Sequence, residues 1–276
     1  MKRIAIFMTV FGFVLAGIGA PIANAQKSQR GLNPGNGTYA ALGDSVAAGL
    51  GLAGQVEDSR CGRTQQAYAY QVAQSRNLQL NHIACSGATA GDLVTTQGVS
   101  GPNVTAQLTQ AFANGTPSLI TITAGANDLE YINFIRKCYV STCGNALDTN
   151  AATTLRTAME AKYKYSLSEI NRLSNGNPPR VVVTGYYNPI SNFCRGKQSF
   201  ATNAEIAWLN GQRDKLNSSI RSAISSYKNV RYASANFDQH GLCATQPWTQ
   251  GLNDNAPLHP TAEGQSRIAR AVLARI

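Results

Sequence analysis

The sequence lacks the spacings of common metal sites, because it contains no C-x-x-C pair, no H-E-x-x-H motif and only three histidines. Zinc sites usually rely on such spacings, so we expect neither a metal nor another cofactor. No serine has glycine both two residues before and two residues after it. That pattern marks the nucleophile turn of α/β-hydrolases, and its absence argues against that enzyme class.

The sequence also lacks a concentrated run of one charge. Its 24 lysines and arginines exceed its 14 acidic residues and give a formal net charge of +10, but they are scattered apart from a short stretch around Lys162 and Lys164. A nucleic-acid-binding protein would concentrate them in a stripe, so we expect no nucleic-acid partner. A solvated basic surface, with at most peripheral contact to a membrane or cell surface, is the favoured interpretation.

The first 25 residues have the three parts of a secretory signal peptide. Lys2 and Arg3 precede an apolar run over 4–22, which ends in the small residues 23–25. The alternative is a membrane anchor, but Pro21 and the A-x-A sequence favour cleavage. We therefore expect a signal peptide at 1–25, a loose polar leader at 26–37, one domain over 38–276 and an extracellular location.

All six cysteines lie after the predicted signal peptide. An even number of cysteines in an exported chain predicts three disulfides. Six cysteines allow fifteen pairings. Our hypothesis joins neighbours along the sequence, because each such bond would pin a loop: Cys61–Cys85, Cys138–Cys143 and Cys194–Cys243.

Strand-like and helix-like segments alternate after residue 37, which predicts an α/β domain with a mainly parallel sheet. Short apolar or β-branched runs predict strands at Thr38–Leu42, Leu78–Ala84, Ser118–Thr123, Arg180–Thr184 and Val230–Ser234. Helices are expected at Arg63–Ser75, Val104–Phe112, Ala151–Leu173, Ala204–Tyr227 and Ala262–Ile276, the last after an N-cap at Thr261.

Reactive side chains follow these strands. Ser45 comes after the first strand, Gly87 after the second and Asn127 after the third, while His259 lies between the last strand and the last helix. Ligands of doubly wound sheets bind outside the carboxyl ends of the strands. The four residues are therefore expected at one edge of the sheet.

Four short blocks, in this order, resemble those of the SGNH (GDSL-type) hydrolases: GDS at 43–45, CSGAT at 85–89, AGAND at 124–128 and LHPTAEGQ at 258–265. The six cysteines and the stretch HGLCATQPW at 240–248 resemble the exported esterase and lipase branch of that family. The resemblance implies a flavodoxin-like three-layer α/β/α sandwich, with a five-stranded sheet in the order 2-1-3-4-5, and hydrolysis of carboxylic esters.

The residues fit this chemistry. A serine hydroxyl needs a base to become a nucleophile, and His259 is a better candidate than His82 or His240, which we interpret as structural. Acyl transfer builds negative charge on the carbonyl oxygen. The candidate donors to it are the Ser45 N–H, the Gly87 N–H and the Asn127 side-chain amide. Asp44 is expected to hold the turn.

One position departs from the family. Its usual aspartate three residues before the histidine is replaced by Ala256. Asp254 would reach His259 only if the loop folds back. We favour instead a main-chain carbonyl of Asp254, Asn255, Ala256 or Pro257 as the acceptor for the histidine Nδ1–H, which gives a Ser–His dyad.

The sequence thus predicts a secreted esterase or lipase acting on a small ester or a lipid, with the residues 49–54 and Tyr186, Tyr187 and Phe193 as candidates for an apolar acyl groove. An acyltransferase, an esterase of acetylated carbohydrate and a non-catalytic surface-binding module are the alternatives. We expect a monomer, although the sequence leaves the oligomeric state open.

Overall fold

The computed structural model describes residues 37–54, 59–190, 194, 201–237 and 239–276. The predicted signal peptide and the predicted leader, apart from Gly37, lie outside these residues. Within them, five parallel strands form one sheet in the order β2-β1-β3-β4-β5. The strands are β1 (Thr38–Gly43), β2 (Gln79–His82), β3 (Leu119–Thr123), β4 (Arg180–Thr184) and β5 (Val230–Ala233).

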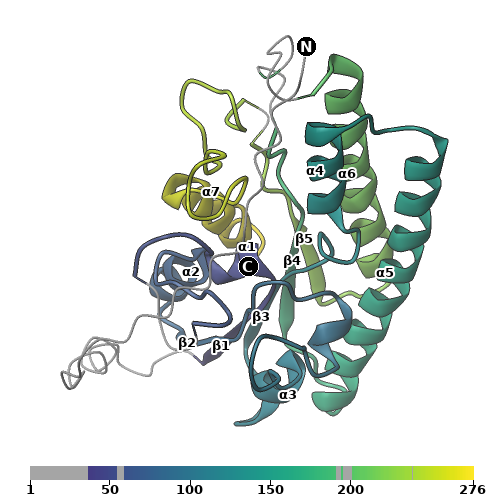
Figure 1. The fold of residues 1–276 in the computed structure, drawn as a ribbon. Coiled ribbons are helices and arrows are strands. Elements are labelled where there is room, and N and C mark those ends of the chain that lie inside the picture. Colours follow the sequence, from purple (N-terminus) through teal and green to yellow (C-terminus); the bar gives the residue numbers. More distant parts are fainter. Residues whose placement is uncertain (1–36, 55–58, 191–193, 195–200, 238) are drawn as a thin grey trace.

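Helices cover both faces of the sheet, which gives the three-layer α/β/α sandwich that the sequence predicted (Figure 1). On one side α2 (Tyr68–Arg76) packs against α7 (Ala262–Leu273), and on the other α5 (Ala146–Leu173) packs against α6 (Asn203–Ile224). No helix in the described ranges is both long and apolar enough to span a bilayer. The shorter helices are α1 (Ser45–Ala48), η2 (Gly91–Leu93), α3 (Gln107–Phe112) and α4 (Tyr131–Val140).

The predicted strands are all present, with ends that differ by up to two residues. The predicted helix at Arg63–Ser75 begins late, at Tyr68. At the start of the predicted helix, Thr64 makes other hydrogen bonds instead. Its N–H donates to Ala48 O (2.9 Å), and its hydroxyl donates to Gly49 O (3.0 Å). This segment therefore supports the turn that follows β1 instead of starting a helix.

The sequence analysis missed α4. Its residues, YINFIRKCYV, are mostly aromatic or β-branched, and such residues favour strands over helices. Packing decides the outcome, because Tyr131, Phe134, Ile135 and Cys138 are buried along one side of the helix. The short α1 and η2 were also missed, because one turn of helix leaves no periodic pattern.

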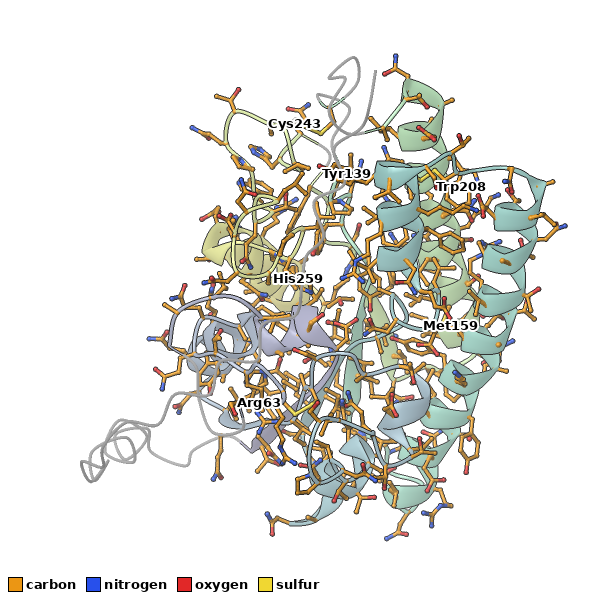
Figure 2. The ribbon with its side chains drawn as sticks, in the orientation of Figure 1. Arg63, Tyr139, Met159, Trp208, Cys243 and His259 are labelled. Carbon is orange, nitrogen blue, oxygen red and sulfur yellow. A yellow bond between two sulfur atoms is a disulfide. The ribbon has the colours of Figure 1, made fainter. Side chains whose placement is uncertain are left out.

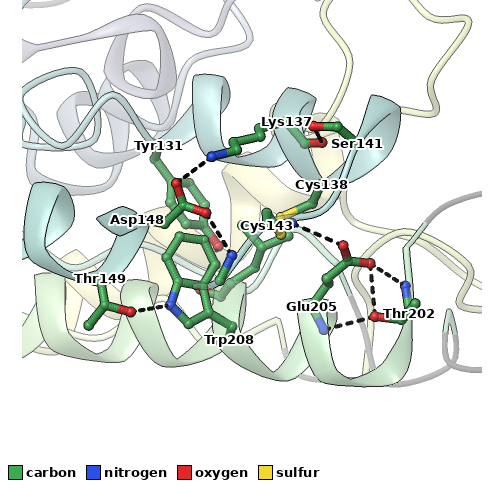
Figure 3. Close-up of a disulfide and its surroundings, with 12 residues drawn as sticks. Tyr131, Lys137, Cys138, Ser141, Cys143, Asp148, Thr149, Thr202, Glu205 and Trp208 are labelled. Carbon is green, nitrogen blue, oxygen red and sulfur yellow. Dashed lines mark hydrogen bonds and ion pairs between the residues drawn. A yellow bond between two sulfur atoms is a disulfide. The ribbon is translucent and has the colours of Figure 1, made fainter. Parts of the chain in front are cut away.

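Three disulfides join Cys61 to Cys85, Cys138 to Cys143 and Cys194 to Cys243, which are the neighbour pairs of our hypothesis. The first links the loop between α1 and α2 to Cys85, three residues after the end of β2. The second joins the end of α4 to the segment before α5 (Figure 3). Both bonds hold loops at the carboxyl edge of the sheet.

Candidate active site

Ser45 stands where β1 turns into α1. Gly43 ends the strand with a φ of +129°, and a Cβ at this position would lie 2.0 Å from Thr123 O, so only glycine fits. Asp44 then caps α1, and Ser45 is the first helical residue. The close packing of β1 against β3 thus places Ser45 at the carboxyl end of the sheet.

Asp44 stabilises this turn, which is the structural role that the sequence analysis predicted for it. Its side chain is only 1% exposed, and one oxygen accepts the Val46 N–H (2.9 Å). The Tyr186 hydroxyl donates to the other oxygen. Burial raises the pKa of Asp44 to about 7, although these two hydrogen bonds favour the charged form. The turn is therefore fixed by buried polar contacts.

His259 lies beside the serine in space despite 214 positions of separation. Its Nε2 is 2.8 Å from Ser45 Oγ, and its Nδ1 is 3.2 Å from Pro257 O. A carbonyl only accepts, so Nδ1 carries the proton and Nε2 is left to accept from the serine. Burial lowers the pKa of His259 below its ordinary value, which favours the neutral ring. This arrangement can draw a proton from the hydroxyl.

The carboxylate of Asp254, the acidic candidate for orienting His259, is bonded to another group. Asp254 and Asn255 are exposed, and an Asp254 carboxylate oxygen accepts the Gly251 N–H at 2.6 Å. Ala256 O accepts the His259 N–H (3.1 Å). Of the main-chain carbonyls that we considered, Pro257 O lies 3.2 Å from the ring nitrogen, and the main chain of Ala256 also favours the charged ring, with a smaller effect.

Gln250, which the sequence analysis did not identify, stabilises the loop that carries His259. Its main chain exchanges hydrogen bonds with Leu258 (3.0 Å) and His259 (2.7 Å). Its side-chain amide is buried and donates to Leu50 O (3.0 Å) and Pro260 O (3.1 Å). One side chain thus ties the histidine loop to the segment that follows the nucleophile.

Two further contacts fix the same loop. Ala256 N donates to the Gln250 side-chain oxygen at 3.1 Å. Leu258 has a φ of +69°, which is costly for a residue with a branched side chain. The buried Tyr187 hydroxyl donates to Leu258 O at 2.9 Å and helps to hold this conformation. The backbone next to His259 is therefore set by Gln250 of the same loop and by Tyr187, which is 71 positions from Leu258.

The candidate oxyanion donors lie on the loops beside the serine. Gly87 has a φ of +82°, which favours glycine there. The loop is held because both Ser86 N and Ser86 Oγ donate to Cys61 O, at 3.0 and 2.7 Å. Asn127 donates one amide hydrogen to Ala88 O (2.8 Å), which orients the side chain and leaves its second amide hydrogen for a ligand.

A cavity of about 280 Å³ brings these residues together. Ser45, Gly87, Asn127 and His259 all line it, so the structure gathers the four residues at one edge. Of the candidates for an apolar groove, Leu50, Tyr186 and Tyr187 line it, whereas Phe193 lies outside the described residues. The remaining wall is mainly apolar and comes from Tyr131, Ile132, Ile135, Pro189, Leu216 and Leu258.

The other two histidines are engaged away from this cavity. His82 Nε2 is 3.0 Å from Ala47 O, and burial lowers the pKa of His82 to about 4. His240 stacks on Trp248 with ring centroids 3.7 Å apart, and its Nδ1 is 2.8 Å from Gln246 O. Across the described residues, no cluster of three or more His, Cys, Asp or Glu side chains could hold a metal ion.

Comparison with known sequences gives one family and two similar proteins. The model of the GDSL-like lipase/acylhydrolase family matches residues 41–267. Lipase 1 of Streptomyces coelicolor is 27% identical over 279 residues, which cover 96% of each chain. A lipase of Streptomyces rimosus is 27% identical over 241 residues, which cover 83% of this chain and 82% of the relative.

Solved structures agree with the fold. An extracellular lipase from Streptomyces rimosus superposes with a TM-score of 0.70 at 25% identity, covering 87% of this chain and 99% of that one. Phospholipase A1 from Streptomyces albidoflavus gives a TM-score of 0.71 at 24% identity over the same shares. At this identity the second likeness concerns the fold alone.

Proposed function

Because the chain belongs to the GDSL-like lipase/acylhydrolase family and is a carboxylic ester hydrolase, we propose that it works through a Ser45 acyl-enzyme with His259 as the base. The observation that carries this proposal is the 2.8 Å contact between Ser45 Oγ and His259 Nε2, with Nδ1 directed to Pro257 O. This is the geometry that a nucleophile and its base require.

In the first half-reaction, His259 Nε2 takes the hydroxyl proton as Ser45 Oγ bonds to the ester carbonyl carbon. The negative charge that develops on the carbonyl oxygen is stabilised by the N–H groups of Ser45 and Gly87 and the free amide hydrogen of Asn127. The imidazolium then gives its proton to the leaving alcohol oxygen. Water, deprotonated by the same ring, hydrolyses the acyl-enzyme.

The lining of the cavity favours an ester with an apolar acyl part, such as a lipid or a short-chain acyl ester. Ile132, Ile135 and Leu216 line it with aliphatic side chains that suit an acyl chain, while Arg136 and Arg213, which also line it, suit a polar or anionic part of the substrate. The buried Tyr186 and Tyr187 hydroxyls are already used by Asp44 and Leu258. An acyl chain is therefore the better match for this wall.

A fluorophosphonate probe tests the proposal directly, because it forms a covalent bond only with an activated serine. We expect the probe's mass on the peptide containing Ser45, together with loss of p-nitrophenyl butyrate hydrolysis. Labelling of another serine, or inhibition without labelling of Ser45, would contradict the assignment.

Asp254 should be dispensable. Replacing it with alanine is expected to lower kcat/KM by less than about tenfold, because Pro257 O already accepts from His259 and the carboxylate serves the Gly251 N–H. Initial rates with p-nitrophenyl butyrate measure this effect. Asn253→Ala, at an exposed neighbour, is the matched control. A fall of several orders of magnitude for Asp254→Ala alone would make Asp254 part of the machinery.

The pH profile follows from the protonation of the base. Only neutral His259 can accept the serine proton, so kcat/KM should rise with pH and level off above the pKa of His259. Since burial lowers that pKa, the midpoint is expected below about 6.5. Asp44, with a pKa of about 7, is the other titrating group at this turn, so the Asp44→Asn variant is measured alongside. A midpoint above 6.5 in both proteins would contradict this prediction.

We also propose that the protein is secreted after removal of residues 1–25. Three disulfides and the similarity to an extracellular lipase support export. N-terminal sequencing of the protein recovered from the culture medium should begin at Gln26.

A further inference from the structure

Large apolar side chains that are exposed gather on one part of the surface. Among the described residues there are five, and Ile132 (38% exposed), Tyr139 (44%) and Val140 (67%) all belong to α4. A fourth, Leu147 (78%), lies in the first turn of α5, whereas Tyr165 is the one that lies elsewhere. Single exposed apolar residues are common, but a contiguous group marks an interaction site.

The three residues of α4 share one face. They stand at positions i, i+7 and i+8, and with 100° per residue they span about 100° of the helix circumference. The opposite side is buried, where Phe134 packs against the Trp208 ring. In Figure 2, Tyr139 and Trp208 lie on opposite sides of α4.

The exposed face continues the wall of the catalytic cavity. Ile132, Ile135 and Arg136 line that cavity, and Tyr139 follows Ile135 by one helical turn. We call Ile132, Tyr139, Val140 and Leu147 the apolar strip. It begins at the cavity and extends along α4 to the start of α5.

The strip is rigidly held. The Cys138–Cys143 disulfide joins the end of α4 to the segment before α5 (Figure 3). Lys137 Nζ contacts an Asp148 oxygen at 2.6 Å, and the other Asp148 oxygen accepts the Gly144 N–H at 2.9 Å. These contacts fix the first turn of α5, which carries Leu147, relative to α4, so the strip is preformed.

The charge of the strip is positive. Arg136 is exposed between Ile132 and the Tyr139–Val140 pair, and without Lys2 and Arg3 of the proposed signal peptide the chain carries a formal net charge of 10 − 2 = +8. Glu130, exposed directly before α4, accepts from Asn133. Asp148, the acidic residue at the far end, is buried against Lys137. A group of apolar side chains that includes a cation is suited to bind a surface whose interior is apolar and whose outer groups are anionic.

We propose that the apolar strip docks the protein on the anionic surface of aggregated lipid, with the catalytic cavity opening toward the lipid. The proposal rests on the proposed function, because the docked surface would supply the ester. Ile132, Tyr139, Val140 and Leu147 would enter the headgroup region, and Arg136 would meet the negative headgroups. An acyl chain could then pass from the lipid along Ile132 into the cavity.

A second copy of the chain fits the strip less well. A two-fold contact places the same patch on both subunits, so it would put two Arg136 cations into one interface. It would also cover the wall through which substrate has to enter the cavity. Both consequences favour a lipid surface as the occupant.

Vesicle sedimentation tests the proposal with Val140→Asp/Leu147→Asp, two exposed positions outside the catalytic machinery. The matched control is Ala161→Asp/Tyr165→Asp, which adds the same charge about 21 to 27 Å along α5 from Leu147. The vesicles contain equal parts of diether phosphatidylglycerol and diether phosphatidylcholine, so that no ester is consumed. Hydrolysis of the soluble p-nitrophenyl butyrate is measured in parallel.

We expect the unaltered protein to bind these vesicles, more weakly as salt is added, and the strip variant to bind at least about tenfold more weakly. The control should bind as the unaltered protein does, and all three should hydrolyse the soluble ester at rates within about twofold. Equal loss in both variants, no loss in either, or no vesicle binding by the unaltered protein would overturn the proposal. So would a dimer that only the strip variant dissociates. Absence of soluble-ester hydrolysis in all three proteins would instead refute the proposed function.

Discussion

Replacement of Ser45 with alanine is expected to lower kcat for p-nitrophenyl butyrate by roughly 10⁴- to 10⁶-fold, and His259→Ala should lower it by a similar factor. In the proposed mechanism the two side chains act as a unit, because Ser45 Oγ lies 2.8 Å from His259 Nε2 and the hydroxyl is a weak nucleophile without this base. The double variant should therefore be little slower than either single variant. Steady-state rates and fluorophosphonate labelling measure the loss.

The chain offers a matched control for each substitution. Ser86 lines the same cavity, but its hydroxyl is bonded to Cys61 O, so Ser86→Ala should keep its rate within about tenfold. His240 is stacked on Trp248, and His240→Ala should behave likewise. If Ser45→Ala kept more than a tenth of the rate, or if Ser86→Ala lost as much as Ser45→Ala, the nucleophile would have been assigned wrongly.

The sequence predicted the strands well because each is a short apolar run whose ends are marked by turn-forming residues. The order of β1, β2 and β3 came from the resemblance, and it brings the loops after these strands together. The proximity of Ser45, Gly87 and Asn127 could be predicted for this reason, since each lies within five residues after the end of a strand. A local signal and a known topology together located them.

The parts that hold His259 could not be predicted in this way. Gln250 contacts Leu50 across 200 positions, and a lone glutamine in a loop gives no signal of such a bond. The φ of +69° at Leu258 is also unexpected from the sequence, because this region favours glycine and asparagine. Both features depend on tertiary contacts. The helix α4 was missed for a related reason, since burial of its apolar side outweighs the strand preference of its residues.

Replacement of Asn127 with alanine is expected to lower kcat by about 10²- to 10³-fold, with a smaller change in KM. Its free amide hydrogen would stabilise the oxyanion, and loss of one such donor typically costs about 2.7–4 kcal/mol in the transition state. The uncharged ground-state carbonyl gains less from the same donor, so the effect should fall on kcat. Full kinetics with p-nitrophenyl butyrate separate the two constants.

The bond from Asn127 to Ala88 O raises the question of whether the variant simply disturbs the loop. Thermal unfolding answers it, because a disturbed loop would lower the midpoint, whereas loss of the oxyanion donor alone would leave the midpoint unchanged. Asn133→Ala, at an exposed asparagine of α4, is the control and should leave kcat unchanged. If Asn127→Ala lowered kcat by less than about fivefold, the oxyanion would have to be stabilised by the main-chain N–H groups of Ser45 and Gly87 alone.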